Sequence, residues 1–80
     1  MENNKIDSNL FVEKFAEQFE DTSADTFKLD TIFRDIEEWD SMIALSIIAM
    51  VDETFNAKLT GEAIKNSKTI EDLINKIETN

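Results

Sequence analysis

The sequence predicts an all-α fold, a small four-helix bundle of three main helices and one short helix, with a long loop between the first two helices. Strands and tight hairpins usually need glycine or proline at their turns, and this chain has one glycine and no proline. No segment alternates strictly between apolar and polar residues. Apolar residues instead recur at helical spacing in three places, which favours helices.

The first helix is expected from about Ser8 to about Phe19, because the apolar residues of this segment share one helical face. Ser8 is the expected N-cap, since a serine hydroxyl can accept a hydrogen bond from the first turn of a helix. The apolar face consists of Phe11, Val12, Phe15, Ala16 and Phe19.

The middle helix is expected from about Ser41 to about Phe55 and is apolar on more than one side. One face belongs in the core, and the polar residues lie roughly opposite it. Met42 and Ala49 lie among these polar residues, and Met50 is expected at the edge of the core. The predicted core face consists of Ala44, Ile47, Ile48, Val51 and Phe55.

The last main helix is expected from about Ile70 to Glu78, and a short helix from about Thr60 to Lys65 precedes it. Thr69 is the expected N-cap of the last helix, with Asp72 three residues later as in a capping box. The clearest amphipathic stripe of the chain lies here, at Ile70, Leu73, Ile74 and Ile77.

The segment between the first two helices, Glu20 to Asp40, is expected to be a long loop that lies across the bundle. It has too many large apolar residues for a disordered linker. Trp39 is expected to anchor the loop, and Glu37 and Glu38 to form a solvated charge run. The expected anchors are Phe27, Leu29, Ile32, Phe33, Ile36 and Trp39.

The composition excludes several classes of function. The 80 residues are enough for one small domain, so residues 1–80 are expected to form a single unit. The chain has no cysteine, which excludes disulfides and a cysteine-based zinc site and fits a reducing compartment. It also has no histidine, so neither a Ser-His-Asp arrangement nor an HExxH metal site can be built.

The formal net charge of −10 predicts which partners the chain favours. Nucleic acids and anionic membranes bind proteins through lysine and arginine clusters, so both are unexpected partners. A basic patch on another protein is the expected partner, although an acidic surface also serves solubility alone. No apolar run approaches the length of a membrane span, and we expect a cytoplasmic monomer.

The most informative stretch runs from Asp35 to Met42, where the long loop meets the middle helix. Asp40 and Ser41 are favoured N-cap residues, so a purely structural role is one interpretation. A functional role is the other, because free N–H groups and the helix dipole favour an anion at a helix N-terminus. The chain has no histidine to activate Ser41, so another protein would have to modify it.

Here the sequence resembles the acyl carrier protein family, in which Asp-Ser-Leu stands at the start of the second helix. This chain has Asp40-Ser41-Met42 at that place, after a similar approach over residues 30–36. The resemblance continues through residues 51–55, where the family has an apolar–acidic run ending in Phe, and through residues 69–73 of the last helix. It covers nearly the whole chain.

The resemblance implies a non-catalytic carrier that holds its cargo as a thioester on a 4′-phosphopantetheine arm. A phosphopantetheinyl transferase would attach the arm to Ser41 from coenzyme A, using magnesium. Partner enzymes of fatty acid, polyketide or other specialised acyl biosynthesis would then dock through basic patches. The positions that match the partner-facing residues of the family are Asp40, Met42, Leu45, Ala49, Asp52 and Glu53.

The chain departs from the family pattern in two places. Glu37-Glu38-Trp39 stands where the family often has a glycine before Asp-Ser. The approach Trp39-Asp40-Ser41 looks more like carriers of specialised pathways. Ile43 and Ser46 replace positions that are often acidic in carriers of fatty acid synthesis.

Two alternatives to an acyl carrier stay open. One is a peptidyl or aminoacyl carrier, and the other is an unmodified acidic module that only docks on partners. A calcium site in the loop lacks the ligand spacing and central glycine of an EF-hand, which leaves at most weak, diffuse cation binding. Its candidate ligands are Asp21, Asp25, Asp30 and Asp35.

Overall fold

A computed structural model of the chain describes residues 6–79, which form helices around a single apolar core. The predicted all-α fold with three main helices and one short helix is confirmed. A two-stranded antiparallel ladder of two residues per strand accompanies the helices. The elements are α1 (Ser8–Ala16), η1 (Ala24–Thr26), η2 (Phe33–Asp35), α2 (Ser41–Phe55), β1 (Ala57–Lys58), α3 (Gly61–Lys65), α4 (Ile70–Lys76) and β2 (Glu78–Thr79), where η denotes a 3₁₀ turn.

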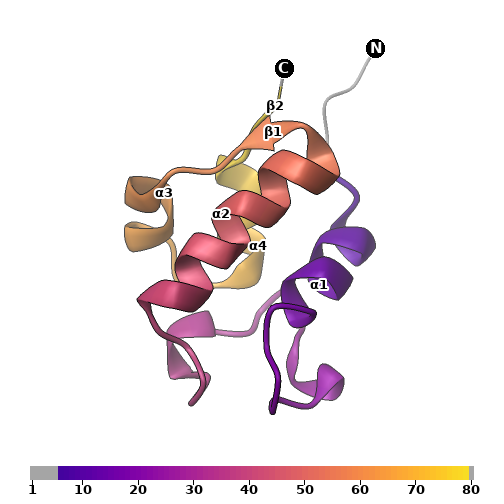
Figure 1. Ribbon diagram of the computed structural model, residues 1–80, viewed down its shortest axis with the longest axis vertical. Helices are drawn as coiled ribbons and strands as arrows, with labels where there is room; N and C mark the ends of the chain where they lie inside the picture. The colour runs from indigo at the N-terminus through magenta and orange to yellow at the C-terminus, as the bar shows by residue number, and fades with distance from the viewer. Residues whose placement is uncertain (1–5, 80) are drawn as a thin grey trace.

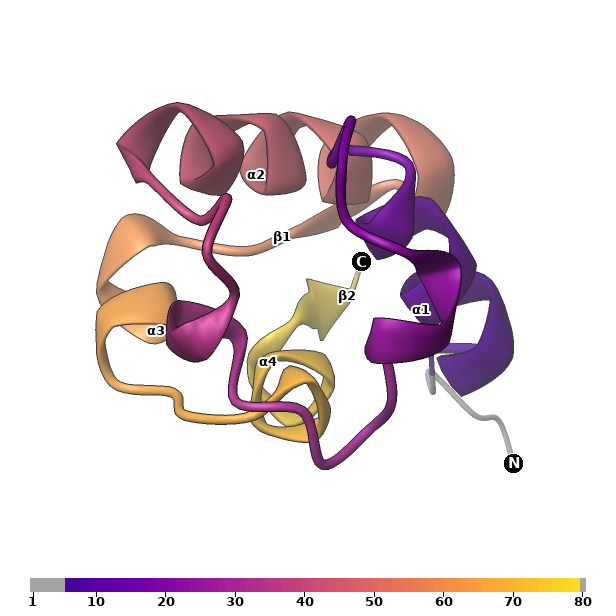
Figure 2. The same ribbon diagram turned by 90° about the horizontal axis from the view of Figure 1, so that it is seen from below.

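The helices enclose the core between them. In Figure 1, α2 crosses in front of α4, with α1 on one side and the short α3 on the other. Seen from below, the loop between α1 and α2 runs across the lower end of the bundle (Figure 2). The largest fully buried side chains are Phe11, Phe15, Phe33, Ile47, Val51, Leu59, Ile70 and Leu73.

The predicted ends of α1 need correction. Asp7 caps the helix in place of Ser8, because its carboxylate accepts a hydrogen bond of 3.2 Å from the N–H of Leu10. The helix ends at Ala16 rather than at Phe19, where the chain tightens into a turn. Phe19 is nevertheless buried, as a member of the predicted apolar face, although it lies beyond the end of the helix.

The middle helix α2 has its predicted ends, and its core face is buried or packed against the core. Met50 is fully in the core, only 6% exposed, rather than at its edge. Asn56 follows the helix with a left-handed backbone, φ 52° and ψ 46°. Asparagine tolerates this conformation better than most residues, so it ends α2 and turns the chain into β1.

The last helix α4 begins as predicted, with a capping box between Thr69 and Asp72. It ends at Lys76, so the prediction that the helix reaches Glu78 is wrong. The backbone becomes extended at Ile77, and residues 78–79 pair with residues 57–58 in the ladder. Pairing with β1 therefore replaces the last helical turn. Ile77 is half-buried against the core from this extended conformation.

Backbone hydrogen bonds attach the long loop to the start of α4. The N–H of Phe33 donates to the carbonyl of Lys68, and the N–H of Ile70 donates to the carbonyl of Thr31. Of the predicted anchors, five are buried or half-buried, but Leu29 is 37% exposed and is not an anchor. The loop is thus fixed by paired backbone as well as by the apolar side chains that the sequence indicates.

Arg34 adds a second attachment, between the loop and α3. Its guanidinium donates to the carbonyls of Ser67 at 2.6 Å, Ile64 at 2.7 Å and Lys65 at 2.8 Å. These carbonyls lie at the end of α3, where a helix leaves acceptors without partners and a positive charge is favourable. A five-residue helix has few hydrogen bonds of its own, so Arg34 stabilises it from outside.

We predict that Arg34→Ala lowers the free energy of unfolding by about 2–3 kcal/mol, because charge-assisted hydrogen bonds contribute more than neutral ones. Arg34→Lys should restore only part of this loss, since an ammonium lacks the fork that reaches several carbonyls at once. Urea denaturation measures both. Lys28→Ala, which removes a positive charge from the same loop, is the control; equal losses in Arg34→Ala and Lys28→Ala would contradict the prediction.

Candidate functional site

Asp40 and Ser41 form the junction between the long loop and α2. The Asp40 carboxylate accepts a 2.9 Å hydrogen bond from the N–H of Ile43, and the Asp40 carbonyl accepts one from Ala44. Asp40 is therefore the N-cap, as one of the two interpretations of this motif predicts, and its backbone is extended. Ser41 is the first helical residue and is not needed for the cap.

The Ser41 side chain is exposed, and its hydroxyl makes no hydrogen bond with any of residues 6–79. Within the same described part of the chain, the N–H groups of Ser41 and Met42 donate to no protein acceptor. Free N–H groups at the positive end of a 15-residue helix suit a phosphate. A phosphodiester on Ser41 therefore fits the local structure without displacing an existing interaction.

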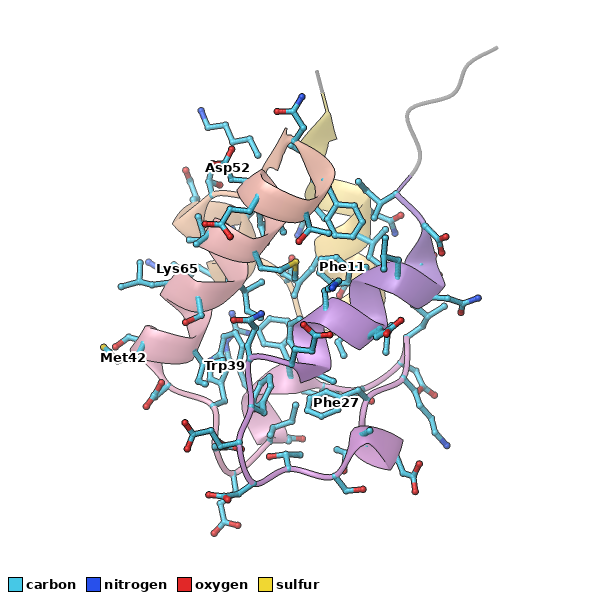
Figure 3. The ribbon with its side chains drawn as sticks, turned by 45° about the vertical axis from the view of Figure 1, so that its right-hand side comes forward. Phe11, Phe27, Trp39, Met42, Asp52 and Lys65 are labelled. Atoms are coloured by element: carbon cyan, nitrogen blue, oxygen red, sulfur yellow. The ribbon has the colours of Figure 1, made fainter. Side chains whose placement is uncertain are left out.

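The outward face of α2 begins beside Ser41 with two large apolar side chains. Met42 is 71% exposed and Leu45 is 63% exposed, the largest values for large apolar residues in the described part of the chain. Figure 3 shows Met42 pointing away from the bundle, and Trp39 on the side toward α1. Asp40, Ala49, Asp52 and Glu53 are also exposed, so the structure leaves all six predicted partner-facing residues accessible.

The predicted charge run before the site is only half correct. Glu37 is exposed, but Glu38 is half-buried as a residue, and its carboxylate accepts three hydrogen bonds from the segment that follows α1. The N–H groups of Glu20 and Asp21 donate to it at 2.8 and 3.1 Å, and the hydroxyl of Thr22 donates at 2.8 Å. Glu38 is a link between residues 20–22 and the site, which the sequence analysis missed.

These hydrogen bonds stabilise the ionised form of Glu38. The N–H of Glu20 contributes most, followed by the Thr22 hydroxyl, and together they lower the pKa of Glu38 below its ordinary value of 4.5. The link between Glu38 and residues 20–22 depends on the path of the loop in space. Nothing in the local sequence around either segment indicates it.

Neither a metal-binding cluster nor a membrane-spanning helix is found among the residues that the structure describes. Among the acidic side chains that the structure describes, which end before Glu78, no three gather closely enough to hold a metal ion, so the four loop aspartates form no such cluster. In the same part of the chain, none of the helices has both the length and the apolar character needed to span a bilayer.

Comparisons with known proteins agree with the geometry of the site. The sequence profile of a family described as phosphopantetheine attachment site matches residues 9–77. The chain is also similar to an acyl carrier protein of Onion yellows phytoplasma (strain OY-M), with 33% identity over 51 residues. That alignment covers 64% of this chain and 67% of the relative. No solved structure is significantly similar to the chain.

The hydrogen bonds of Glu38 predict a pH dependence of stability. A carboxyl whose pKa is lower in the folded state stabilises the fold above its unfolded pKa, here 4.5, and loses that contribution as the pH falls through its folded pKa. Glu38→Gln should therefore be less stable than wild type at pH 7. The difference should shrink below pH 4.5.

Thermal unfolding followed by circular dichroism between pH 3 and pH 7 measures this difference. Glu37→Gln is the matched control, because it removes the same charge from the adjacent exposed residue. A gap between wild type and Glu38→Gln that is constant across this range would show that the Glu38 carboxylate is not held by residues 20–22.

Proposed function

The chain belongs to the family of carrier domains with a phosphopantetheine attachment site, and we propose that Ser41 is the residue to which the group is attached. The prosthetic group of this family is 4′-phosphopantetheine, which a phosphopantetheinyl transferase attaches. The chain is accordingly a carrier that other enzymes modify and use, and it is not an enzyme itself.

The observation that carries the assignment is the free Ser41 hydroxyl at the first position of α2. An attachment residue must enter the active site of another protein, so its hydroxyl must be exposed and unpaired, as that of Ser41 is. Ser46 is the other exposed serine of α2, but it lies in the second turn, where the backbone N–H groups are already used within the helix. Of these two serines, only Ser41 lies beside backbone N–H groups that are free to bind a phosphate.

The part played by this chain in the attachment is simple. The Ser41 oxygen forms the new phosphate ester while the pyrophosphate bond of coenzyme A breaks and adenosine 3′,5′-bisphosphate leaves. The hydroxyl proton passes to a base of the transferase, because the chain has no histidine and Asp40 is engaged in the cap. The arm, once attached, supplies a terminal thiol that carries cargo as a thioester. The chain lacks cysteine and so offers no competing thiol.

We further propose that the cargo is an acyl group of fatty acid, polyketide or other specialised acyl biosynthesis. The support is the similarity to the phytoplasma protein, whose name is acyl carrier protein. A peptidyl or aminoacyl cargo uses the same attachment and is the alternative cargo. An unmodified docking module is the alternative function, and it would leave Ser41 without a role.

The outward face of α2 is the proposed docking surface for the transferase and for the enzymes that use the cargo. It places two exposed apolar side chains, Met42 and Leu45, beside Ser41. Two acids, Asp52 and Glu53, lie about three helical turns beyond Ser41. Partners with an apolar spot flanked by basic residues complement this pattern. Between Asp40 and Asp52 the helix carries no acid, so the middle of this face is uncharged.

We also propose that residues 1–80 act as one carrier domain and as a monomer. One core connects all four helices, which supports a single cooperative unit. The absence of cysteine fits a reducing compartment such as the cytoplasm, which is where we place the carrier.

We predict that wild-type protein gains the mass of one phosphopantetheine group when it is incubated with coenzyme A, magnesium and a broad-specificity phosphopantetheinyl transferase. Ser41→Ala should gain nothing, because the accepting hydroxyl is gone. Its fold should stay intact, since the Ser41 hydroxyl is exposed and makes no hydrogen bond within the described part of the chain. Intact-mass spectrometry measures the gain, and circular dichroism checks the fold.

Ser46→Ala is the control, because it removes an exposed hydroxyl from the same helix and should load like wild type. Loading of Ser41→Ala would refute the attachment site. A wild type that gains no mass with several transferases, and carries no arm beforehand, would favour the unmodified docking module.

The docking surface predicts a salt-dependent effect of its acids. The double variant Asp52→Asn/Glu53→Gln should be loaded with a kcat/KM about fivefold lower at low salt, because electrostatic steering toward a basic partner is weakened. The deficit should shrink in concentrated salt, which screens exposed charges. Steady-state loading kinetics measure both effects.

The matched control is Glu62→Gln/Glu71→Gln, which removes two exposed charges from α3 and α4. If the control variant is slowed as much as Asp52→Asn/Glu53→Gln, net charge rather than the face of α2 guides docking.

A further inference from the structure

Trp39 lies two residues before Ser41, and its indole rests on a group of buried aromatic rings. The ring centroid of Phe33 is 4.7 Å from that of Trp39. Phe15 stacks on the indole nearly in parallel, at 6.2 Å and 10°, and Phe19 lies at 6.4 Å. Phe15 and Phe33 are completely buried, so the indole packs against residues that are themselves held on all sides.

Hydrogen bonds also hold the backbone around Trp39 in place. The N–H of Trp39 donates to the carbonyl of Ile36 at 2.9 Å, which closes a turn. The adjacent Glu38 carboxylate is held by the three hydrogen bonds from residues 20–22. The loop is therefore anchored up to and including residue 39.

On the other side of the site, the cap of α2 holds Asp40. The Asp40 carboxylate and carbonyl accept hydrogen bonds from the first turn of the helix, so Asp40 moves with α2. Asp40 therefore joins the anchored Trp39 to the helix, and Ser41 is the next residue. Neither Asp40 nor Ser41 has a buried side chain of its own.

From this arrangement we infer that Trp39 is a positioning residue for the modification of Ser41, acting through the backbone of Asp40. This inference rests on the proposed attachment at Ser41. Phosphoryl transfer requires the attacking oxygen in line with the breaking bond, and small misplacements of a reacting group are costly to the rate. By holding the start of α2 at one orientation, Trp39 presents the hydroxyl to the transferase in a single position.

A purely structural role for Trp39 makes different predictions. Loss of stability alone would lower loading only in proportion to the unfolded fraction. Loss of positioning lowers the kcat of loading of molecules that are folded, with little change in KM, because the docking face of α2 stays intact. It also loosens the backbone at Ser41 without loosening α4.

The test compares loading of wild type, Trp39→Ala and Trp39→Phe by a broad-specificity phosphopantetheinyl transferase with coenzyme A and magnesium. Rates are expressed per folded molecule, using circular dichroism at the assay temperature. Trp39→Ala should lower kcat about tenfold, within the range that misplacement of a reacting group produces. Trp39→Phe should stay within about threefold of wild type, because it keeps a ring against Phe33. Ile70→Val, in the core of α4, controls for lost stability and should load like wild type per folded molecule.

A second readout keeps the test informative if Trp39→Ala does not fold, with Trp39→Leu then taking its place. In the folded variant, the NMR order parameter of the Ser41 amide should fall from about 0.85 toward 0.6, while amides of α4 keep their values. Normal kcat with a rigid Ser41 amide would overturn the inference and leave the attachment site standing. A wild type that gains no arm would overturn both.

Discussion

The ring of Phe15 connects the first helix to the loop that leads to Ser41, and the position of the site depends on this contact. Phe15 is fully buried, and five other aromatic rings lie around it with centroids 5.5 to 6.5 Å away. Two of these rings, Phe27 and Phe33, come from the loop, and Trp39 comes from its end. Because a small domain has one modest core, α1, the loop and the approach to the site share it.

Polar contacts add to the attachments that the aromatic core makes between the loop and the helices. Arg34 fastens the loop to α3, and Glu38 fastens the approach to the site onto residues 20–22. Both side chains satisfy backbone groups that a helix end or a turn leaves unpaired. The result is a fixed junction with an exposed hydroxyl at Ser41, which suits a protein whose chemistry is performed by its partners.

Much of this arrangement could be predicted from the sequence, because local signals and tertiary packing agree. The ends of α2 follow from the cap at Asp40 and from the periodic apolar residues, and the capping box of α4 follows from Thr69 and Asp72. Where the predictions failed, a partner distant in the sequence decided. The end of α4 is set by pairing of residues 78–79 with β1, and the role of Glu38 by residues 20–22.

The sequence predicts where the proposed site lies but not the contacts around it. Asp40-Ser41 at a helix start indicated Ser41, and the family profile covers this motif within residues 9–77. The periodicity of α2 placed Met42 outside the core, and it is 71% exposed. The stacking of Trp39 on Phe15 joins residues 24 positions apart, and single-sequence patterns carry no signal for such a contact.

Peptide mapping of the loaded protein tests the central claim most directly. Trypsin should release residues 35–58 as one peptide, which contains both Ser41 and Ser46, and fragmentation can tell the two apart. The account predicts that the phosphopantetheine group lies on Ser41 alone. A group found on Ser46, or on any residue outside this peptide, would contradict it.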